Sequence, residues 1–159
     1  MNFGLCVAGS CGIGVKGAAD QGVFMIPASL EDLAENFSLF DDWEERYRYL
    51  IDLGRELPHM DEGLKTDERL VRGCTSRVWM DFNVEDGVLS FVADSDAHIV
   101  RGLVALLVAA YQGRTLGEVR NIDIAKVFRD IGLDQHLSPN RRNGFYAMVE
   151  RIRLLALPC

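Results

Sequence analysis

The sequence predicts a single α+β domain in which helices pack against a small antiparallel β-sheet. Apolar residues recur at helical spacing before residue 58 and after residue 97, and they alternate with polar residues over 78–93. An Asp-Gly pair divides the alternating stretch into two strands. Helices, then an antiparallel sheet, then helices is an order typical of α+β domains. The length of 159 residues fits one such domain.

The first 28 residues differ in composition from the rest of the chain. They contain six glycines and only two charged side chains. Their Gly-x-Gly-x-x-Gly run at 12–17 is weak evidence for a nucleotide site, because the chain lacks the repeated βαβ units that this motif requires. We therefore predict a flexible N-terminal extension over 1–28, or a chain that starts at Met25, and a folded domain over 29–157.

Two helices are expected before the sheet. Ser29 is a candidate N-cap for a short first helix. Asp41 and Asp42 each stand three residues before a glutamate, which is the spacing of a capping box, and Pro58 ends the helix that follows. The expected apolar faces are Leu30, Leu33 and Phe37 in the first helix and Trp43, Tyr47, Leu50, Ile51 and Leu57 in the second.

The alternating stretch predicts a β-hairpin. Strands over 78–84 and 88–93 flank the turn at Asp86-Gly87, and residues 69–72 are a candidate third strand. The cluster at 94–96, Asp-Ser-Asp, is then expected to open a helix. The body of that helix, Leu103–Tyr111, is apolar on almost every side, so we expect it to be buried at the centre of the domain.

Two further helices complete the prediction. The first covers residues 124–131 and ends at Gly132, a favoured residue just after a helix C-terminus. The last begins at Ser138, whose hydroxyl can cap it, with Pro139 in its first turn. The expected core face of the last helix is Phe145, Met148, Val149, Ile152 and Leu155.

Charge and cysteine usage exclude several classes of function. The net charge of −7 would repel nucleic acids and anionic membranes. No apolar run approaches the ~18 residues that a transmembrane helix needs. The four cysteines, at positions 6, 11, 74 and 159, are too few and too scattered for a disulfide-stabilised or zinc-binding domain. We therefore expect a cytoplasmic protein without a metal site.

Cys74 is the strongest candidate for a chemically active residue. It lies in the run 72–76, Arg-Gly-Cys-Thr-Ser, whose small residues lead directly into the first strand. Functional side chains concentrate on loops of rigid scaffolds. Gly73 would let another chain approach the sulfur, and the cations Arg72 and Arg77 would favour the nucleophilic thiolate.

Two other interpretations of Cys74 remain open at this point. It could be a buried cysteine that acts as a small apolar residue. It could also belong to a cysteine hydrolase, although His59, His98 and His136 match no protease signature.

Arg141 and Arg142 break a local rule. With Ser138 as the N-cap they occupy positions N3 and N4 of the last helix, where a cation opposes the helix dipole. Such a break is expected at functional sites. A role in function, a buried acidic partner and simple exposure to solvent are the three explanations.

Four short motifs follow one another along the chain. They are Leu50-Ile51-Asp52-Leu53-Gly54; Val71-x-Gly73-Cys74-x-Ser76-x-Val78-Trp79; Ala93-Asp94-Ser95-Asp96-Ala97-x-Ile99-Val100-x-Gly102-Leu103; and Gln135-His136-Leu137-Ser138-Pro139-x-Arg141. In this order and at this spacing they resemble the SufE-type sulfur acceptors. The resemblance covers about residues 29–157 and not residues 1–25. It implies a fold like that of the IscU-type scaffolds, with the acceptor loop at one end of a small sheet.

The resemblance implies a sulfur carrier rather than a stand-alone enzyme. A SufS-type cysteine desulfurase, with its own pyridoxal phosphate, would place a persulfide sulfur on Cys74. The carrier would stimulate that enzyme and pass the sulfur to a SufBCD-like iron–sulfur scaffold complex, and it would need no cofactor of its own. Gly73, Thr75, Ser76 and Arg141 would support the loop or bind the partner.

Some questions stay open within this resemblance. Thr75 and Arg77 depart from the family pattern, in which glutamine is expected at both positions, so the resemblance leaves the details of docking open. A homodimer is compatible with the resemblance. An iron–sulfur scaffold of similar fold is one alternative, but a scaffold needs several cluster ligands and the matched region contains Cys74 alone. A cysteine hydrolase or thiol oxidoreductase is the other, and the chain has no Cys-x-x-Cys pair.

Overall fold

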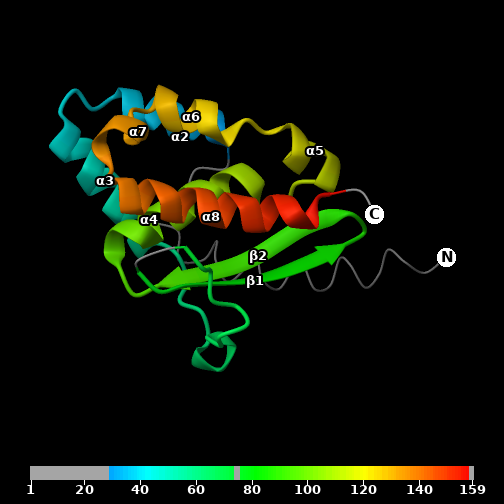
Figure 1. Ribbon diagram of the computed structural model, residues 1–159. Helices are drawn as coiled ribbons and strands as arrows, with labels where there is room; N and C mark the ends of the chain where they lie inside the picture. The colour runs from blue at the N-terminus through cyan, green and yellow to red at the C-terminus, as the bar shows by residue number, and fades with distance from the viewer. Residues whose placement is uncertain (1–28, 74–75, 158–159) are drawn as a thin grey trace.

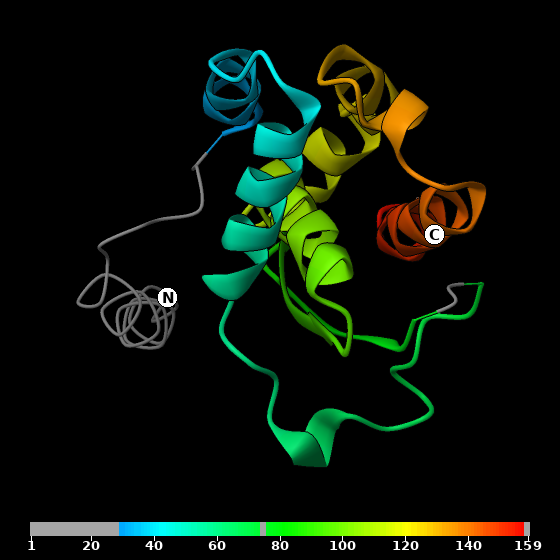
Figure 2. The ribbon, with the colours of Figure 1, turned by 90° about the vertical axis from the view of Figure 1, so that its left-hand side faces the viewer.

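The computed structural model describes residues 29–73 and 76–157, and these form the α+β arrangement that the sequence predicts (Figure 1). The predicted extension, residues 1–28, lies outside the described residues. The elements are, in chain order, α2 (Leu30–Ser38), α3 (Trp43–Arg55), the 3-10 helix η1 (Glu62–Leu64), β1 (Val78–Glu85), β2 (Val88–Ser95), α4 (His98–Tyr111), α5 (Leu116–Asn121), α6 (Ile124–Asp130), α7 (Leu133–His136) and α8 (Pro139–Leu155). In Figures 1 and 2 the α-helices lie on one side of the hairpin, and the segment with η1 lies on the other.

The β-hairpin has the register that its alternating sequence predicts. β1 and β2 pair antiparallel from Val78 opposite Ser95 to Glu85 opposite Val88. Asp86 and Gly87 both have positive φ, 54° and 76°, as a two-residue turn between twisted strands requires. The buried apolar side chains of the hairpin are Val78, Met80, Leu89, Phe91 and Ala93. Val84, an apolar member of the alternation close to the turn, is exposed.

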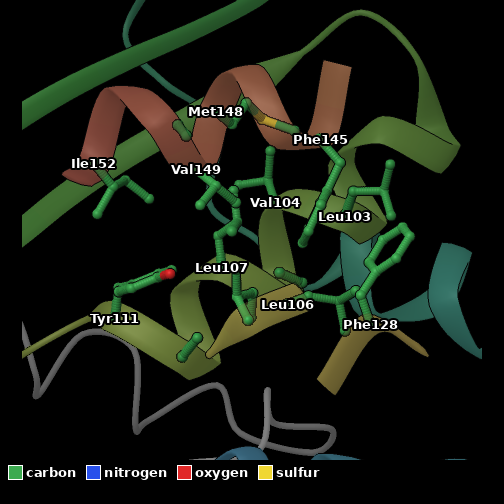
Figure 3. Packing of buried hydrophobic residues seen from close by; sticks show 14 of the residues in the cluster. Leu103, Val104, Leu106, Leu107, Tyr111, Phe128, Phe145, Met148, Val149 and Ile152 are labelled. Atoms are coloured by element: carbon green, nitrogen blue, oxygen red, sulfur yellow. The ribbon is translucent and has the colours of Figure 1, made fainter. Parts of the chain in front are cut away.

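The start of α4 differs from the prediction. The cluster at 94–96 does not open the helix: β2 continues to Ser95, and α4 begins at His98 after Ala97, whose side chain cannot cap it. Asp94 is instead buried, because its carboxylate pairs with an arginine on α4. The body of α4 is buried as expected, against α3, α2, α8 and β2, and Figure 3 shows part of this packing with residues of α8 and α6. The side chains that Figure 3 labels on these helices include Leu103 and Leu107 of α4, Phe145 and Ile152 of α8, and Phe128 of α6.

Helices α3 and α4 approach each other closely at two glycines. A Cβ atom added to Gly54 would lie 2.5 Å from the backbone nitrogen of Gly102. A Cβ added to Gly102 would lie 2.3 Å from the carbonyl oxygen of Leu50. Real Cβ atoms do not approach other atoms this closely, so only glycine fits at either position. The two helices therefore pack backbone against backbone, which places α3 beside the central helix.

Apart from the start of α4, the predicted helix caps agree with the structure. The hydroxyl of Ser29 accepts from the N–H of Asp32 (3.1 Å), and that of Ser138 caps α8 with Pro139 in the first turn. Gly132 follows α6 with φ of 83°. The short helices α5 and α7, six and four residues long, were not predicted, because so few residues show no clear period. None of the helices in 29–73 and 76–157 is long and apolar enough to span a lipid bilayer.

Candidate functional site

The residues on either side of Cys74 pair with each other. Cys74 and Thr75 themselves lie outside the described residues. The N–H of Val71 donates to the carbonyl of Val78 (2.8 Å), and the N–H of Met80 donates to the carbonyl of Arg69 (2.9 Å). Residues 72–77 therefore close a loop between two paired segments. The third strand predicted at 69–72 is reduced to one bridge, between Leu70 and Trp79, because the chain turns away at Gly73.

Gly73 is required by the backbone of this loop. Its φ is 92°, in the left-handed region that favours glycine. A Cβ at this position would lie an ordinary 3.5 Å from the Cβ of Ala147 on α8, so conformation rather than crowding selects glycine. Ser76 is half-buried, and Arg72 and Arg77 are exposed on either side of Cys74. Two solvent-exposed cations therefore lie within three positions of Cys74 in the sequence.

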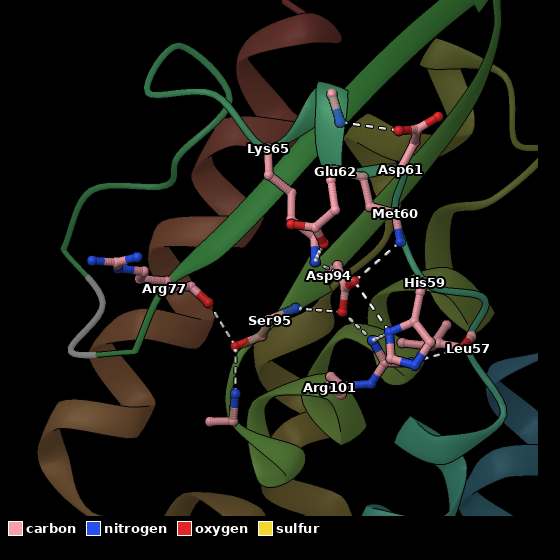
Figure 4. Close-up of polar contacts among 12 residues, drawn as sticks. Leu57, His59, Met60, Asp61, Glu62, Lys65, Arg77, Asp94, Ser95 and Arg101 are labelled. Atoms are coloured by element: carbon pink, nitrogen blue, oxygen red, sulfur yellow. Dashed lines mark hydrogen bonds and ion pairs between the residues drawn. The ribbon is translucent and has the colours of Figure 1, made fainter.

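The C-terminal end of the loop is fixed by the junction between β2 and α4. The hydroxyl of Ser95 donates to the carbonyl of Arg77 (2.7 Å) and accepts from the N–H of Ala97 (3.2 Å), as Figure 4 shows. The N–H of Arg77 in turn donates to the carboxylate of Asp96 (3.1 Å). Ser95 and Asp96, which were expected to help open a helix, thus bind the loop instead.

Helix α8 fixes the N-terminal end of the loop. The guanidinium of Arg151 donates to the carbonyl oxygens of Leu70 (2.9 Å) and Glu68 (2.7 Å). Sequence reasoning missed this contact, because an arginine on an amphipathic helix is normally read as exposed. No local signal could have found it, since 81 residues separate Arg151 from Leu70.

A buried charge cluster lies beside the site (Figure 4). The carboxylate of Asp94, only 1% exposed, forms an ion pair with the guanidinium of Arg101. It also accepts from the N–H groups of Met60 (3.0 Å) and Ser95 (2.8 Å). Burial alone would raise the pKa of Asp94, but these two N–H donors, with the charges of Arg101 and Lys65, outweigh it and lower the pKa. Asp94 is therefore ionised at neutral pH.

Arg101 joins this cluster to the segment after α3. Its guanidinium donates to the carbonyl oxygens of Gly54 (3.1 Å) and Leu57 (2.6 Å). His59, with its side chain 80% exposed, and Lys65 each place a nitrogen 3.4 Å from Asp94. The sequence does carry a signal for this network, because Arg101 is the one charged residue between Ile99 and Tyr111.

Arg141 lies on the surface at the start of α8. Its guanidinium donates to the hydroxyl of Tyr47 on α3 (2.8 Å). Arg142 donates to the carbonyl of Asp134 (3.1 Å). Both partners are neutral oxygens, so the described contacts give no acidic partner for either cation. The structure thus joins Arg141 to α3, whereas Gly73 lies against Ala147, further along α8.

The three histidines lie in different surroundings. His98 is exposed at the start of α4, and His136 stacks on the ring of Trp43 with centroids 3.9 Å apart. His59 lies beside Asp94. Within residues 29–73 and 76–157, no three His, Cys, Asp or Glu side chains are grouped closely enough to bind a metal ion.

Comparison with known proteins places this arrangement in a family. The family model of SufE, described as an Fe-S metabolism associated domain, matches residues 31–156. The chain belongs to the SufE family. An uncharacterized SufE-like protein of Rhizobium etli is 44% identical over 137 residues, covering 84% of this chain and 93% of its own. One of Rhizobium meliloti is 45% identical over 129 residues, covering 79% and 92%.

A solved structure has the SufE-like fold found here. The solution structure of a hypothetical protein from Thermus thermophilus superposes with a TM-score of 0.66. The two chains share 22% sequence identity, and the match covers 83% of this chain and 96% of the Thermus thermophilus chain. At this identity the comparison supports the fold alone. The resemblance inferred from the four motifs is confirmed, and so is the α+β fold. Membership of the SufE family gives the protein a role in iron–sulfur metabolism.

Proposed function

We propose that the protein accepts a persulfide sulfur on Cys74 from a SufS-type cysteine desulfurase, stimulates that enzyme, and passes the sulfur to a SufBCD-like scaffold complex. One observation carries the proposal: Cys74 is the only cysteine within the matched residues 31–156. A single thiol suffices for a carrier, whereas a cluster scaffold needs several ligands. Contacts from β1, the β2–α4 junction and α8 support the loop on both sides of this residue.

The transfer is a thiol–persulfide exchange. The Cys74 thiolate attacks the terminal sulfur of the desulfurase persulfide, a new S–S bond forms, and the desulfurase thiolate leaves. The electron count is unchanged, so neither an oxidant nor a reductant is consumed, and the pyridoxal phosphate belongs to the desulfurase. The exposed guanidinium groups of Arg72 and Arg77 favour the attacking thiolate. We place this carrier in the cytoplasm, because its scattered cysteines suit a reducing compartment.

Replacing Cys74 with serine is expected to abolish sulfur loading. The change is nearly isosteric, so the fold should persist. After incubation with desulfurase and cysteine, intact-protein mass spectrometry should show an adduct of about 32 Da, one sulfur atom, on the parent chain and none on Cys74→Ser. The matched control replaces Cys6, Cys11 and Cys159 together by serine and should keep the adduct. An adduct on Cys74→Ser, or its loss in the triple variant, would assign the acceptor elsewhere.

Replacing Arg141 with alanine is expected to weaken desulfurase stimulation with little change in melting temperature. Arg141 is exposed and donates to one neutral hydroxyl, so its removal should cost no more than about 1 kcal/mol of unfolding free energy. Desulfurase turnover is titrated with each variant to separate affinity from maximal rate. Tyr47→Phe, which removes the hydroxyl but keeps the cation, is the control for the hydrogen bond. A melting temperature several degrees lower for Arg141→Ala would make this arginine structural and contradict the proposal.

A further inference from the structure

The segment that leads toward Cys74, residues 68–73, is joined to the sheet by one β-bridge, between Leu70 and Trp79. The side chain of Arg69 adds an ion pair with Asp81 on the same strand, β1 (2.8 Å). In the described part of the chain the sheet has two strands, β1 and β2, so no third strand lies along the other side of this segment. A segment with so few backbone bonds opens locally at a low free-energy cost unless other groups hold it.

Arg151 on α8 supplies bonds on the side that lacks a strand. Its Nη1 donates to the carbonyl oxygen of Leu70 (2.9 Å), and its Nη2 donates to that of Glu68 (2.7 Å). The carbonyl oxygen of Arg69, between them, instead accepts from the N–H of Met80 on β1 (2.9 Å). The segment is therefore held between β1 and α8, and the guanidinium takes the place of a neighbouring strand.

A guanidinium group suits this task better than other donors. Its N–H groups are fixed in one plane, so two of them can reach two acceptors at once. Hydrogen bonds from a charged donor are also stronger than those between neutral groups. Arg151 belongs to none of the ion pairs within residues 29–73 and 76–157, so no described carboxylate competes for its donors. Its guanidinium therefore serves the segment rather than an ion pair.

The other end of the segment meets the same stripe of α8. Ala147 lies one helical turn before Arg151, so the two side chains share a face of the helix. A Cβ added to Gly73 would lie 3.5 Å from the Cβ of Ala147. Figure 2 shows α8 beside the chain that runs from η1 to residue 73. Because α8 is itself anchored in the core, through Met148 among others, it is a rigid support for the whole segment.

We infer that Arg151 is a positioning residue for sulfur transfer, which fixes residues 68–73 against α8 and so sets how Cys74 is presented to the desulfurase persulfide. The inference rests on the proposed function. Exchange between sulfurs requires the reacting atoms to be close and aligned, and a small displacement lowers the rate by a large factor. Since the donors of Arg151 are engaged within the chain, it acts on the rate of transfer in the docked complex and not on the affinity of docking.

The test replaces Arg151 with methionine in the full 159-residue chain, which keeps an unbranched stem and removes both donors. Persulfide-loaded desulfurase is mixed with increasing concentrations of each variant, and the adduct of about 32 Da is followed over time by mass spectrometry. The maximal transfer rate of Arg151→Met should fall about tenfold, while its half-saturating concentration stays within about twofold of the parent value. Arg151→Lys keeps the charge but lacks the planar fork, so its rate should lie between the two.

Arg153→Met is the matched control, because it removes the same group from the same helix. Arg153 donates to the carbonyl oxygen of Ile122 (3.4 Å) and not to the segment, so this variant should transfer sulfur at the parent rate. Hydrogen exchange gives a readout that is independent of transfer. The N–H of Val71, which donates to the carbonyl oxygen of Val78, should exchange faster in Arg151→Met and at the parent rate in Arg153→Met.

The outcomes separate this inference from the proposed function. A parent chain that takes up no sulfur would overturn the proposed function and this inference with it. A parent chain that loads normally, with an unchanged maximal rate for Arg151→Met, would overturn this inference alone. A raised half-saturating concentration at an unchanged maximal rate would do the same, because Arg151 would then be a docking residue. An equal loss of rate in Arg153→Met would also overturn it, since any weakening of α8 would then explain the effect.

Discussion

Replacing Arg101 with methionine is expected to lower the free energy of unfolding by roughly 3–5 kcal/mol. Methionine keeps most of the volume of the side chain but leaves the carboxylate of Asp94, 1% exposed, without its buried cation. The carbonyl oxygens of Gly54 and Leu57 lose a charged donor as well. Urea unfolding followed by circular dichroism measures the change.

Two comparisons make the result specific to the buried pair. Lys126→Met removes the cation of an exposed ion pair on α6 and should leave the free energy of unfolding almost unchanged. An equally small loss for Arg101→Met would show that the Asp94 cluster contributes little to stability.

The second comparison measures the stability of Arg101→Met and of the parent chain at neutral and at acidic pH. Because the folded protein lowers the pKa of Asp94 below 3.8, its charge stabilises the parent chain at neutral pH, and this contribution is lost as the pH falls through the lowered value. Without Arg101, burial of the Asp94 side chain costs less free energy when its carboxyl group is protonated and neutral. The deficit of Arg101→Met relative to the parent chain should therefore shrink below about pH 4, whereas a packing defect would persist there.

Replacing Gly102 with alanine is expected to destabilise the protein by about 3 kcal/mol or more, or to prevent folding. The added methyl group would lie 2.3 Å from the carbonyl oxygen of Leu50 and 2.9 Å from its carbonyl carbon. These are backbone atoms of α3, which cannot rotate away as a side chain can. Relief requires the two helices to separate, which would open the core around Leu50 and Leu103. The melting temperature and soluble yield report the effect.

Gly117→Ala is the matched control, because it makes the same change within the short helix α5. Its added methyl group would meet atoms only at 3.9 Å. Alanine is the better helix former, so this variant should be unchanged or more stable by up to about 1 kcal/mol. If Gly102→Ala behaved like Gly117→Ala, helices α3 and α4 would have to pack less closely than described here.

Much of the fold was predictable from local patterns. The alternation over 78–93 and the Asp86-Gly87 turn specify the hairpin, because strand period and turn conformation depend on residues adjacent in sequence. Ser29 and Ser138 cap their helices as predicted for the same reason. Four short motifs, one of them around Cys74, indicated the family before any tertiary contact was known.

The way those elements support the site depends on contacts between distant segments. The cluster at 94–96 has the composition of a helix cap, yet Asp94 is buried, because a single arginine on α4 offers it a better partner than the helix end does. Arg151 binds the loop across 81 residues, and Gly54 meets Gly102 across the interface between two helices. No period, cap or turn signal in the sequence records where such segments meet in space. The elements and the candidate reactive residue therefore follow from local sequence, whereas their mutual positions follow from packing.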